Sequence, residues 1–226
     1  MSIDPRQLPL DRSFREERAR AAVLTPEQLT PAAVRLRFMR RAAWTPELRS
    51  DGQDPSPDAP KPAAVLVPLV RHGEQLTVLL TYRARHLQDH AGQISFPGGR
   101  IEPSDSGPID AALREASEET GLAIERIDVL GVLPTYLTVT GFEVTPVVGM
   151  IAAPIALRLD SSEVEDAFEV PLLFLMNPGN HERRLVPGSD ARRCVYAIPF
   201  DDGRRVHFIW GATAAMLRNL YGFLRG

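Results

Sequence analysis

The sequence is poor in cysteine and in long apolar runs, and each shortage removes a class of protein. Its single cysteine, Cys194, excludes an internal disulfide and a zinc site built from several cysteines. Because Cys194 sits in the strand-like run RRCVYAIPF, we expect a buried, unreactive thiol. The longest apolar run, AAVLVPLV, is far too short to span a bilayer, and the first residues, MSIDPRQLPL, lack the pattern of a signal peptide. We therefore expect a cytoplasmic protein.

The net charge is also small, which limits the kinds of partner that the protein attracts. A formal charge of -3 gives no general attraction to nucleic acid or to an anionic membrane, so we expect neither as a partner. A ligand that carries phosphate must then be held by a local site.

Composition and pattern divide the 226 residues into three parts. The hydrophobic content of 44% and charged content of 24% are those of a globular protein with a proper core. Residues 1–49 are predicted to form a helical arm, in which TPEQ (residues 25–28) resembles a capping box that starts the second helix. Residues 50–62 contain five prolines or glycines and no large apolar side chain, which predicts a linker or mobile loop. Residues 63–226 are predicted to form the main domain.

The main domain alternates between strand-like and helix-like segments. The runs AAVLVPLVR and LTVLLTY, split by HGEQ, predict two neighbouring strands joined by a tight turn. Further strand-like runs are IDVLGVLPTYL, EVTPVVGMI, CVYAIPF and VHFIW, and helices are expected at residues 108–120, in VPLLFLM and at residues 211–224. This order predicts an α/β fold with a mixed sheet and helices on both faces.

The segment FPGG, residues 96–99, is followed by an acidic helix. Pro108 suits the first helical position and Gly121 the left-handed residue after the last, so the helix is predicted to run from Pro108 to Thr120. Glu115, Glu118 and Glu119 share one face of it, where each like-charged pair costs a few tenths of a kcal/mol.

Two interpretations of the three glutamates are open at this point. One is a solvated acidic face. The other is a binding site for Mg²⁺ or Mn²⁺, hard ions that take oxygen ligands. Two features favour it: the bare backbone of the glycine turn can approach a ligand closely, and Arg114 can pair with Glu118.

The same residues resemble a known family. REASEETGL, residues 114–122, is similar to the second half of the Nudix box, and the glycine turn precedes it as in that motif. Counted from Gly99, the early acid falls on Asp105 and the gap to Arg114 is eight residues, one longer than usual, which leaves the role of Asp105 open. The resemblance implies a Nudix-type α/β/α sandwich, a hydrolase for phosphoanhydrides, and metal binding by the three glutamates.

A longer signature resembles one branch of that family. The segment LLTYRARHLQDHAGQISFPGG, residues 79–99, is similar to the signature of coenzyme A pyrophosphatases, although Gln88 stands where an arginine is usual. The resemblance implies cleavage of coenzyme A or its thioesters to 3',5'-ADP and 4'-phosphopantetheine or its acyl form. We interpret His90 as a structural histidine.

Roles for individual residues also follow from the resemblance. The carbonyl of Gly99 is expected as a further metal ligand, Arg114 as an orienting residue, and Gly98 as part of the backbone that the substrate approaches. Positive charge near the phosphates is expected from Arg83 and Arg85, for which a solvated strand-end arginine is the alternative. The candidates for the general base are Glu118 and, from SSEVEDAFEV, the acids Glu163, Glu165 and Glu169.

Other functions remain open. A Nudix pyrophosphatase acting on ADP-ribose, NADH or dinucleotides would carry the same box, because the box determines the diphosphate chemistry and not the attached groups. A noncatalytic nucleotide-sensing module is the alternative from another class, and a homodimer is an expectation from the resemblance alone.

Overall fold

The computed structural model describes residues 4–40, 44–50, 59–87, 91–187 and 194–226. Its α-helices are α1 (Arg12–Arg20), α2 (Pro31–Met39), α3 (Pro108–Thr120), α4 (Leu172–Leu175) and α5 (Gly211–Arg225). Its strands are β1 (Lys61–His72), β2 (Gln75–Arg83), β3 (Ile94–Ser95), β4 (Gly98–Arg100), β5 (Asp128–Val132), β6 (Tyr136–Leu137), β7 (Phe142–Ala152), β8 (Val164–Pro171), β9 (Glu182–Leu185), β10 (Cys194–Asp201) and β11 (Val206–Trp210). Four short 3₁₀ turns, η1 (Pro5–Gln7), η2 (Pro26–Leu29), η3 (Ile124–Arg126) and η4 (Pro178–Asn180), complete the described elements.

The predicted mixed sheet is confirmed. Eight described strands form it in the order β3-β2-β1-β7-β5, with β4 paired to β1, β6 to β7 and β8 to β2. The central pair β1 and β7 is parallel and the other pairs are antiparallel. The strands β9, β10 and β11 form a second, antiparallel sheet, which the sequence pattern did not reveal.

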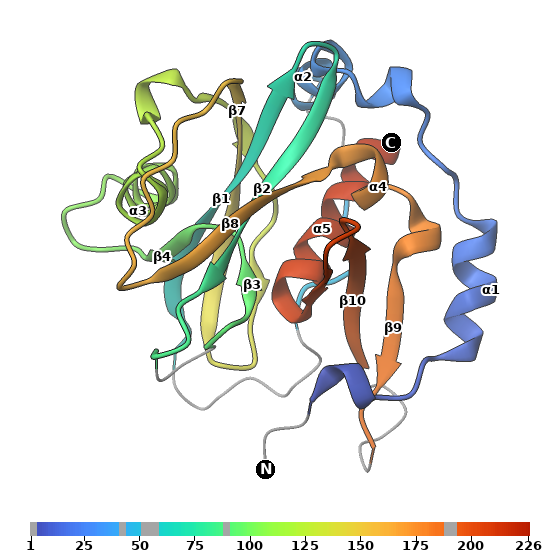
Figure 1. The fold of residues 1–226 in the computed structure, drawn as a ribbon. Helices are drawn as coiled ribbons and strands as arrows, with labels where there is room; N and C mark the ends of the chain where they lie inside the picture. The colour runs from blue at the N-terminus through green and yellow to red at the C-terminus, as the bar shows by residue number, and fades with distance from the viewer. Residues whose placement is uncertain (1–3, 41–43, 51–58, 88–90, 188–193) are drawn as a thin grey trace.

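The mixed sheet has helices on both faces (Figure 1). On one face α3 buries Ala111, Ala112 and Ala116 against side chains of β1, β2 and β7. On the other face α5 and the second sheet enclose the larger core. Small alanine side chains let α3 lie close to the sheet, so its acidic side is brought next to the strand ends.

Helix α3 begins and ends where the sequence predicts. Pro108 occupies its first turn, and Gly121 caps it in the left-handed conformation at φ 70°, with its N–H donating to the carbonyl of Ser117 at 2.8 Å.

The expectation for TPEQ, residues 25–28, was wrong in one respect, because this segment starts η2 and not the second helix. Thr30 caps α2 instead, accepting from the N–H of Ala33, since Pro31 cannot donate a hydrogen bond and so begins a new helix.

Residues of the expected arm share a core with the main domain. Phe14, Leu24, Leu29, Val34 and Phe38 are buried in the same cluster as the strands and α5. The division into 1–49, 50–62 and 63–226 remains a prediction; β1 already begins at Lys61, and residues 51–58 of the expected linker lie outside the described residues.

Two smaller expectations concern the membrane and the thiol. Among the described helices, none has the length and apolarity needed to cross a bilayer. Cys194, at the start of β10, is half-buried, and burial raises the pKa of its thiol and so favours the unreactive protonated form.

Replacing Phe14 by alanine is expected to lower the free energy of unfolding by about 3–5 kcal/mol, because it empties a packed aromatic position. The Phe14 ring is 1% exposed, lies 4.7 Å from the Arg183 guanidinium carbon and 5.2 Å from that of Arg218, and meets Tyr196 edge-on. Urea unfolding followed by circular dichroism measures the change. Val23→Ala, at a position 63% exposed in the same arm, should cost less than about 0.5 kcal/mol. Equal effects from both substitutions would show that the arm is not part of the core.

Candidate active site

The glycine turn lies directly against α3. Gly98 and Gly99 pair with Val65 and Ala64 of β1. A side-chain carbon at Gly98 would meet the carbonyl oxygen of Ala64 at 2.4 Å, and one at Gly99 would meet the Glu115 carboxyl carbon at 2.5 Å. At Gly98 the neighbouring atoms belong to the backbone, so only glycine leaves room there, whereas at Gly99 the Glu115 carboxylate occupies the space that a side chain would take.

Glu119 is the most buried acid of this cluster. Its side chain is 3% exposed; the N–H of Gly98 donates to its Oε2 at 3.3 Å, and Nη1 of Arg83 lies 3.8 Å from its Oε1. Burial raises its pKa to about 8, against the opposing influence of Arg83 and Gly98, and the charges of Glu163 and Glu115 raise the pKa further. The protein thus buries a carboxylate without supplying enough positive charge to balance it.

Glu115 and Glu118 are tied together by Arg114. Nη1 of Arg114 donates to Glu115 at 3.0 Å and to Glu118 at 2.9 Å. Burial is the largest influence on Glu115 and raises its pKa, Arg114 lowers it, and the charges of Glu118 and Glu163 raise it again. The Glu118 side chain is 59% exposed, so Arg114 holds it at the rim of the cluster.

Asp105, whose role the sequence left open, holds Arg114 in place. Nε and Nη2 of Arg114 each donate to a carboxylate oxygen of Asp105 at 2.9 Å, and Nη2 also reaches the carbonyl of Arg100. This bidentate bond, together with the N–H of Glu102, holds the pKa of Asp105 at about 2. The sequence did carry a chemical signal for the pair, since an acid just before a helix can reach an arginine in its second turn.

Glu163, the first of the three later acids, influences the electrostatics of the cluster. Backbone bonds from Arg158 to Thr120 and from Asp160 to Glu119 lead the chain back past the end of α3, and Ala84 N–H donates to the Glu163 carbonyl at 2.8 Å. The charge of Glu163 raises the pKa values of both Glu115 and Glu119. Glu163 therefore lies within electrostatic reach of both.

The other two later acids are bound elsewhere. Glu165 accepts from Nε of Arg85 at 3.0 Å. Glu169 bonds the His72 ring at 2.7 Å and the Thr77 hydroxyl, near the other end of β2.

Arg83 and Arg85 occupy different surroundings. Arg83 is 28% exposed beside Glu119, and its Nε is buried with no hydrogen-bond partner among the described residues. Arg85 is 82% exposed and pairs with Glu165, which is the solvated arrangement considered as its alternative. Gln88 and His90 lie outside the described residues.

The oxygen atoms of this cluster are of the kind that binds a divalent cation, but the side chains do not converge around one position. Carboxylate and carbonyl oxygens of Glu115, Glu119 and Gly99 are the ligands that Mg²⁺ and Mn²⁺ prefer. A bound cation would also stabilise the ionised form of the buried Glu119. In the described part of the chain, however, no three Asp, Glu, His or Cys side chains converge closely enough to hold a metal. Glu118 would have to leave Arg114 to join the other two.

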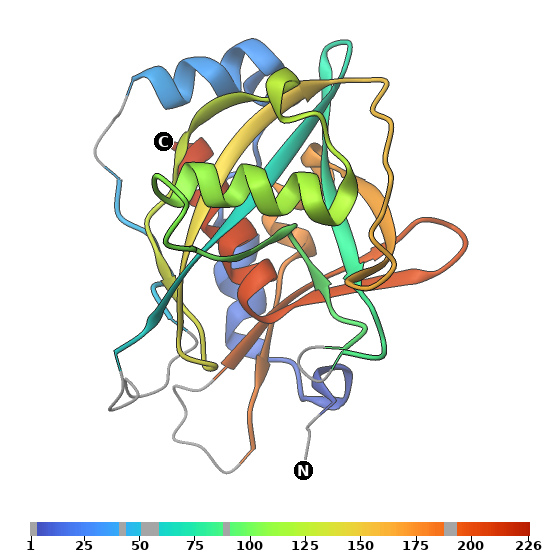
Figure 2. The ribbon, with the colours of Figure 1, turned by 90° about the vertical axis from the view of Figure 1, so that its left-hand side faces the viewer.

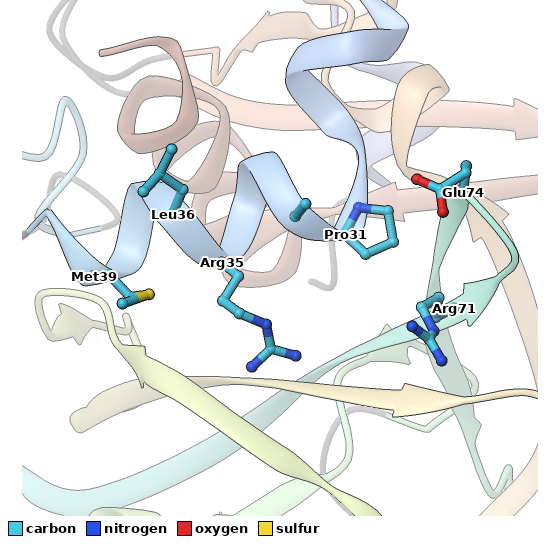
Figure 3. A pocket seen from close by; sticks show the side chains of 7 residues that line it. Pro31, Arg35, Leu36, Met39, Arg71 and Glu74 are labelled. Atoms are coloured by element: carbon cyan, nitrogen blue, oxygen red, sulfur yellow. The ribbon is translucent and has the colours of Figure 1, made fainter.

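A hollow of about 470 Å³ lies elsewhere, between α2 and the turn that joins β1 to β2. Arg35 and Arg71 both point into it (Figure 3). Arg71 and Glu74 flank the turn at the end of β2 opposite to Arg83, and Arg35 is paired with Asp128. The hollow is therefore separate from the glutamates of α3.

Comparison with known proteins identifies the family of this chain. The model of the NUDIX domain matches residues 60–185. The Escherichia coli K12 protein "Uncharacterized Nudix hydrolase NudL" is 42% identical over 159 residues, which cover 70% of this chain and 80% of that protein, and a Shigella boydii protein of the same name matches equally well.

Two solved structures are similar over about half of this chain. A Caenorhabditis elegans Ap4A hydrolase complex is 20% identical over 49% of this chain and 80% of that chain, with a TM-score of 0.43. The Mycobacterium smegmatis Nudix hydrolase RenU is 25% identical over 50% of this chain and 71% of that chain, also with a TM-score of 0.43. Scores this low add nothing to the sequence matches.

In metal-free protein, Glu119→Gln is expected to increase the free energy of unfolding at alkaline pH. The pKa of about 8 in the folded state lies above the ordinary value of 4.5, so between these pH values the folded protein binds more protons than the unfolded chain. Stability therefore falls as the pH rises through this range, and glutamine removes the loss. The gain should be on the order of a few kcal/mol at pH 8 and absent at pH 4.

Urea unfolding in the presence of a chelator measures this difference. The control is Glu118→Gln, the same substitution at an exposed position of the same helix, which should change stability by less than about 0.5 kcal/mol. A Glu119→Gln protein that is less stable than the parent at pH 8 would contradict the account of the buried charge.

Proposed function

This chain belongs to the Nudix family of hydrolases, which act on phosphoric anhydride bonds, and we propose that its substrate is coenzyme A or a coenzyme A thioester. The reaction would be metal-dependent hydrolysis of the diphosphate, giving 3',5'-ADP and 4'-phosphopantetheine or its acyl form. The observation that carries the metal-dependent hydrolysis is the position of Glu115 and Glu119 beside the Gly98–Gly99 turn, where burial raises the pKa values of both carboxyls.

The cofactor in this proposal is Mg²⁺ or Mn²⁺. Glu115, Glu119 and the Gly99 carbonyl would hold it, with Glu118 joining them when its bond to Arg114 is released. Once bound, the ion supplies positive charge that stabilises the negative charge developing on the phosphoryl oxygens. Arg114 orients the glutamates and is itself held by Asp105, so it does not need to touch the substrate.

Glu163 is the general base that the geometry supports best. A base must reach a water molecule beside the phosphorus and must be free to accept its proton. Glu163 acts on the pKa values of both buried glutamates, and no side-chain hydrogen bond or ion pair engages its carboxylate among the described residues. Glu118, the other candidate from the sequence, is bonded to Arg114 and is mostly exposed.

Arg83 is proposed to bind a phosphate oxygen of the substrate. Its buried Nε has no acceptor among the described residues, and a buried donor without a partner costs free energy that a ligand can recover. The Gly98 backbone lies beside it and would approach the same phosphate. A role for Arg85 has less support, because Glu165 already engages its guanidinium.

The choice of coenzyme A rests on the signature in residues 79–99, which includes Arg83 and ends at the glycine turn. ADP-ribose, NADH and dinucleotides remain the alternative substrates, because the glutamates act on the diphosphate that all of them share. A noncatalytic sensing module has no support, because all three glutamates of the box are present. The homodimer is likewise a proposal, and light scattering of the purified protein tests it.

Glu163→Gln is expected to lower kcat by about 10²-fold while Mn²⁺ affinity is retained, because it removes a proton acceptor but not a metal ligand. Glu119→Gln should abolish turnover by several orders of magnitude and weaken Mn²⁺ binding. Steady-state kinetics and Mn²⁺ titration followed by electron paramagnetic resonance measure the two effects. Glu169→Gln, whose carboxylate lies near the other end of β2, serves as the control. A parental rate in Glu119→Gln would refute the metal site.

Substrate preference is tested with a panel of nucleotide derivatives. With Mg²⁺ or Mn²⁺ present, kcat/KM for coenzyme A and its thioesters should exceed that for ADP-ribose and NADH by at least about tenfold, with products identified by mass. A higher kcat/KM for ADP-ribose would overturn the coenzyme A assignment and leave the hydrolase assignment intact.

A further inference from the structure

The pairing of β2 with β8 is interrupted beside the proposed site. Tyr82 lies opposite Asp166, but the next residue, Arg83, lies opposite Val164, so Glu165 is an extra residue on β8. Such a β-bulge bends its strand and changes the direction of the side chains that follow. Here it lies directly before Arg83 on β2 and close to Glu163 on the chain that leads into β8.

Tyr82 and Asp166, which flank this bulge, lie on the face of the sheet opposite α3. The β10–β11 hairpin reaches across to β8 (Figure 2). Nη2 of its Arg205 bonds the carboxylate of Asp166, and the Arg205 guanidinium carbon lies 4.6 Å from the centre of the Tyr82 ring. One arginine thus contacts both members of the last regular pair before the bulge.

A chain of hydrogen bonds fastens Tyr82 to the same hairpin. The Tyr82 hydroxyl lies 3.0 Å from Nδ1 of His207, and Nε2 of His207 donates to Asp202 at 2.9 Å. His207 is 1% exposed and stacks on Phe168 with ring centres 3.9 Å apart. Asp202 in turn accepts from the backbone N–H groups of Arg204 and Arg205, so the turn and the imidazole form one unit.

These contacts end one residue from the proposed site. The residue after Tyr82 is Arg83, which faces Glu119, and the next, Ala84, bonds the backbone of Glu163. We propose that Arg205, Tyr82 and His207 are positioning residues, which hold the bulge so that Arg83 and Glu163 face the substrate phosphate. This inference rests on the proposed function for its effect on catalysis, although the mechanical coupling can be measured separately.

The kinetic test uses Arg205→Met, which removes the guanidinium group that contacts Asp166 and Tyr82, and Tyr82→Phe, which removes the hydroxyl bonded to His207; both keep most of the side-chain bulk. Each should lower kcat about tenfold with KM for Mn²⁺ unchanged, because a small displacement of a reacting group is costly. When either is combined with both Arg83→Met and Glu163→Gln, it should cause at most a twofold further loss, since the two residues whose positions it controls are already disabled.

The chain offers matched controls for both variants. Arg35→Met breaks a pair with Asp128 whose side chains are 47% and 50% exposed, close to the 48% and 46% of Arg205 and Asp166. Tyr221→Phe removes a hydroxyl that donates to the Ala22 carbonyl at 2.6 Å. Both controls should keep kcat within twofold. If Arg205→Met and Tyr82→Phe also keep kcat within twofold, or if their effects multiply fully with that of Arg83→Met and Glu163→Gln combined, the positioning role is refuted.

Hydrogen exchange separates this inference from the proposed function. The amide of Ala84 should exchange at least about fivefold faster in Arg205→Met than in the parent and in Arg35→Met, because its bond to Glu163 is loosened. Unchanged exchange would refute the coupling whatever the kinetics show. Faster exchange in Arg205→Met, found together with a parent protein that hydrolyses no nucleoside diphosphate derivative, would refute the proposed function and uphold the coupling.

Discussion

Negative charge buried against a bare backbone turn is the constraint on which the rest of this structure depends. The carboxyl group of Glu119 is buried and that of Glu115 is partly buried, which disfavours the ionised form of each acid, and both lie against Gly98 and Gly99. Arg83 opposes part of this charge without a close ion pair at Glu119. A bound cation would supply the positive charge that the ionised carboxylates lack.

Several parts of the fold serve that arrangement. Alanines on α3 allow close packing on the sheet, so the acidic side of the helix meets the glycine turn. Asp105 anchors Arg114, which in turn orients two of the glutamates. The second sheet and the N-terminal helices enclose the core on the opposite face, and the hairpin of that sheet contacts the strands that carry Arg83 and lead from Glu163.

The local features were predictable from the sequence, and the long-range ones were not. Pro108 and Gly121 mark the ends of α3 because each has a backbone preference that acts within one residue of its position. The spacing of the glutamates places them on one face for the same reason. The bond of Arg114 to Asp105, the burial of Phe14 and the partners of Glu165 and Glu169 depend instead on how distant segments pack. The second sheet was missed because a strand pattern does not specify which sheet the strand joins.

The most direct test of the central claim is a crystal structure with Mn²⁺ and a nonhydrolysable diphosphate analogue, in which anomalous scattering locates the ion. We expect an anomalous peak about 2.1–2.3 Å from oxygens of Glu115, Glu119 and the Gly99 carbonyl, with Glu118 turned away from Arg114 toward the ion and a phosphate oxygen as a further ligand. A bound analogue with no peak among these residues, or with the only ion held elsewhere, would contradict the account.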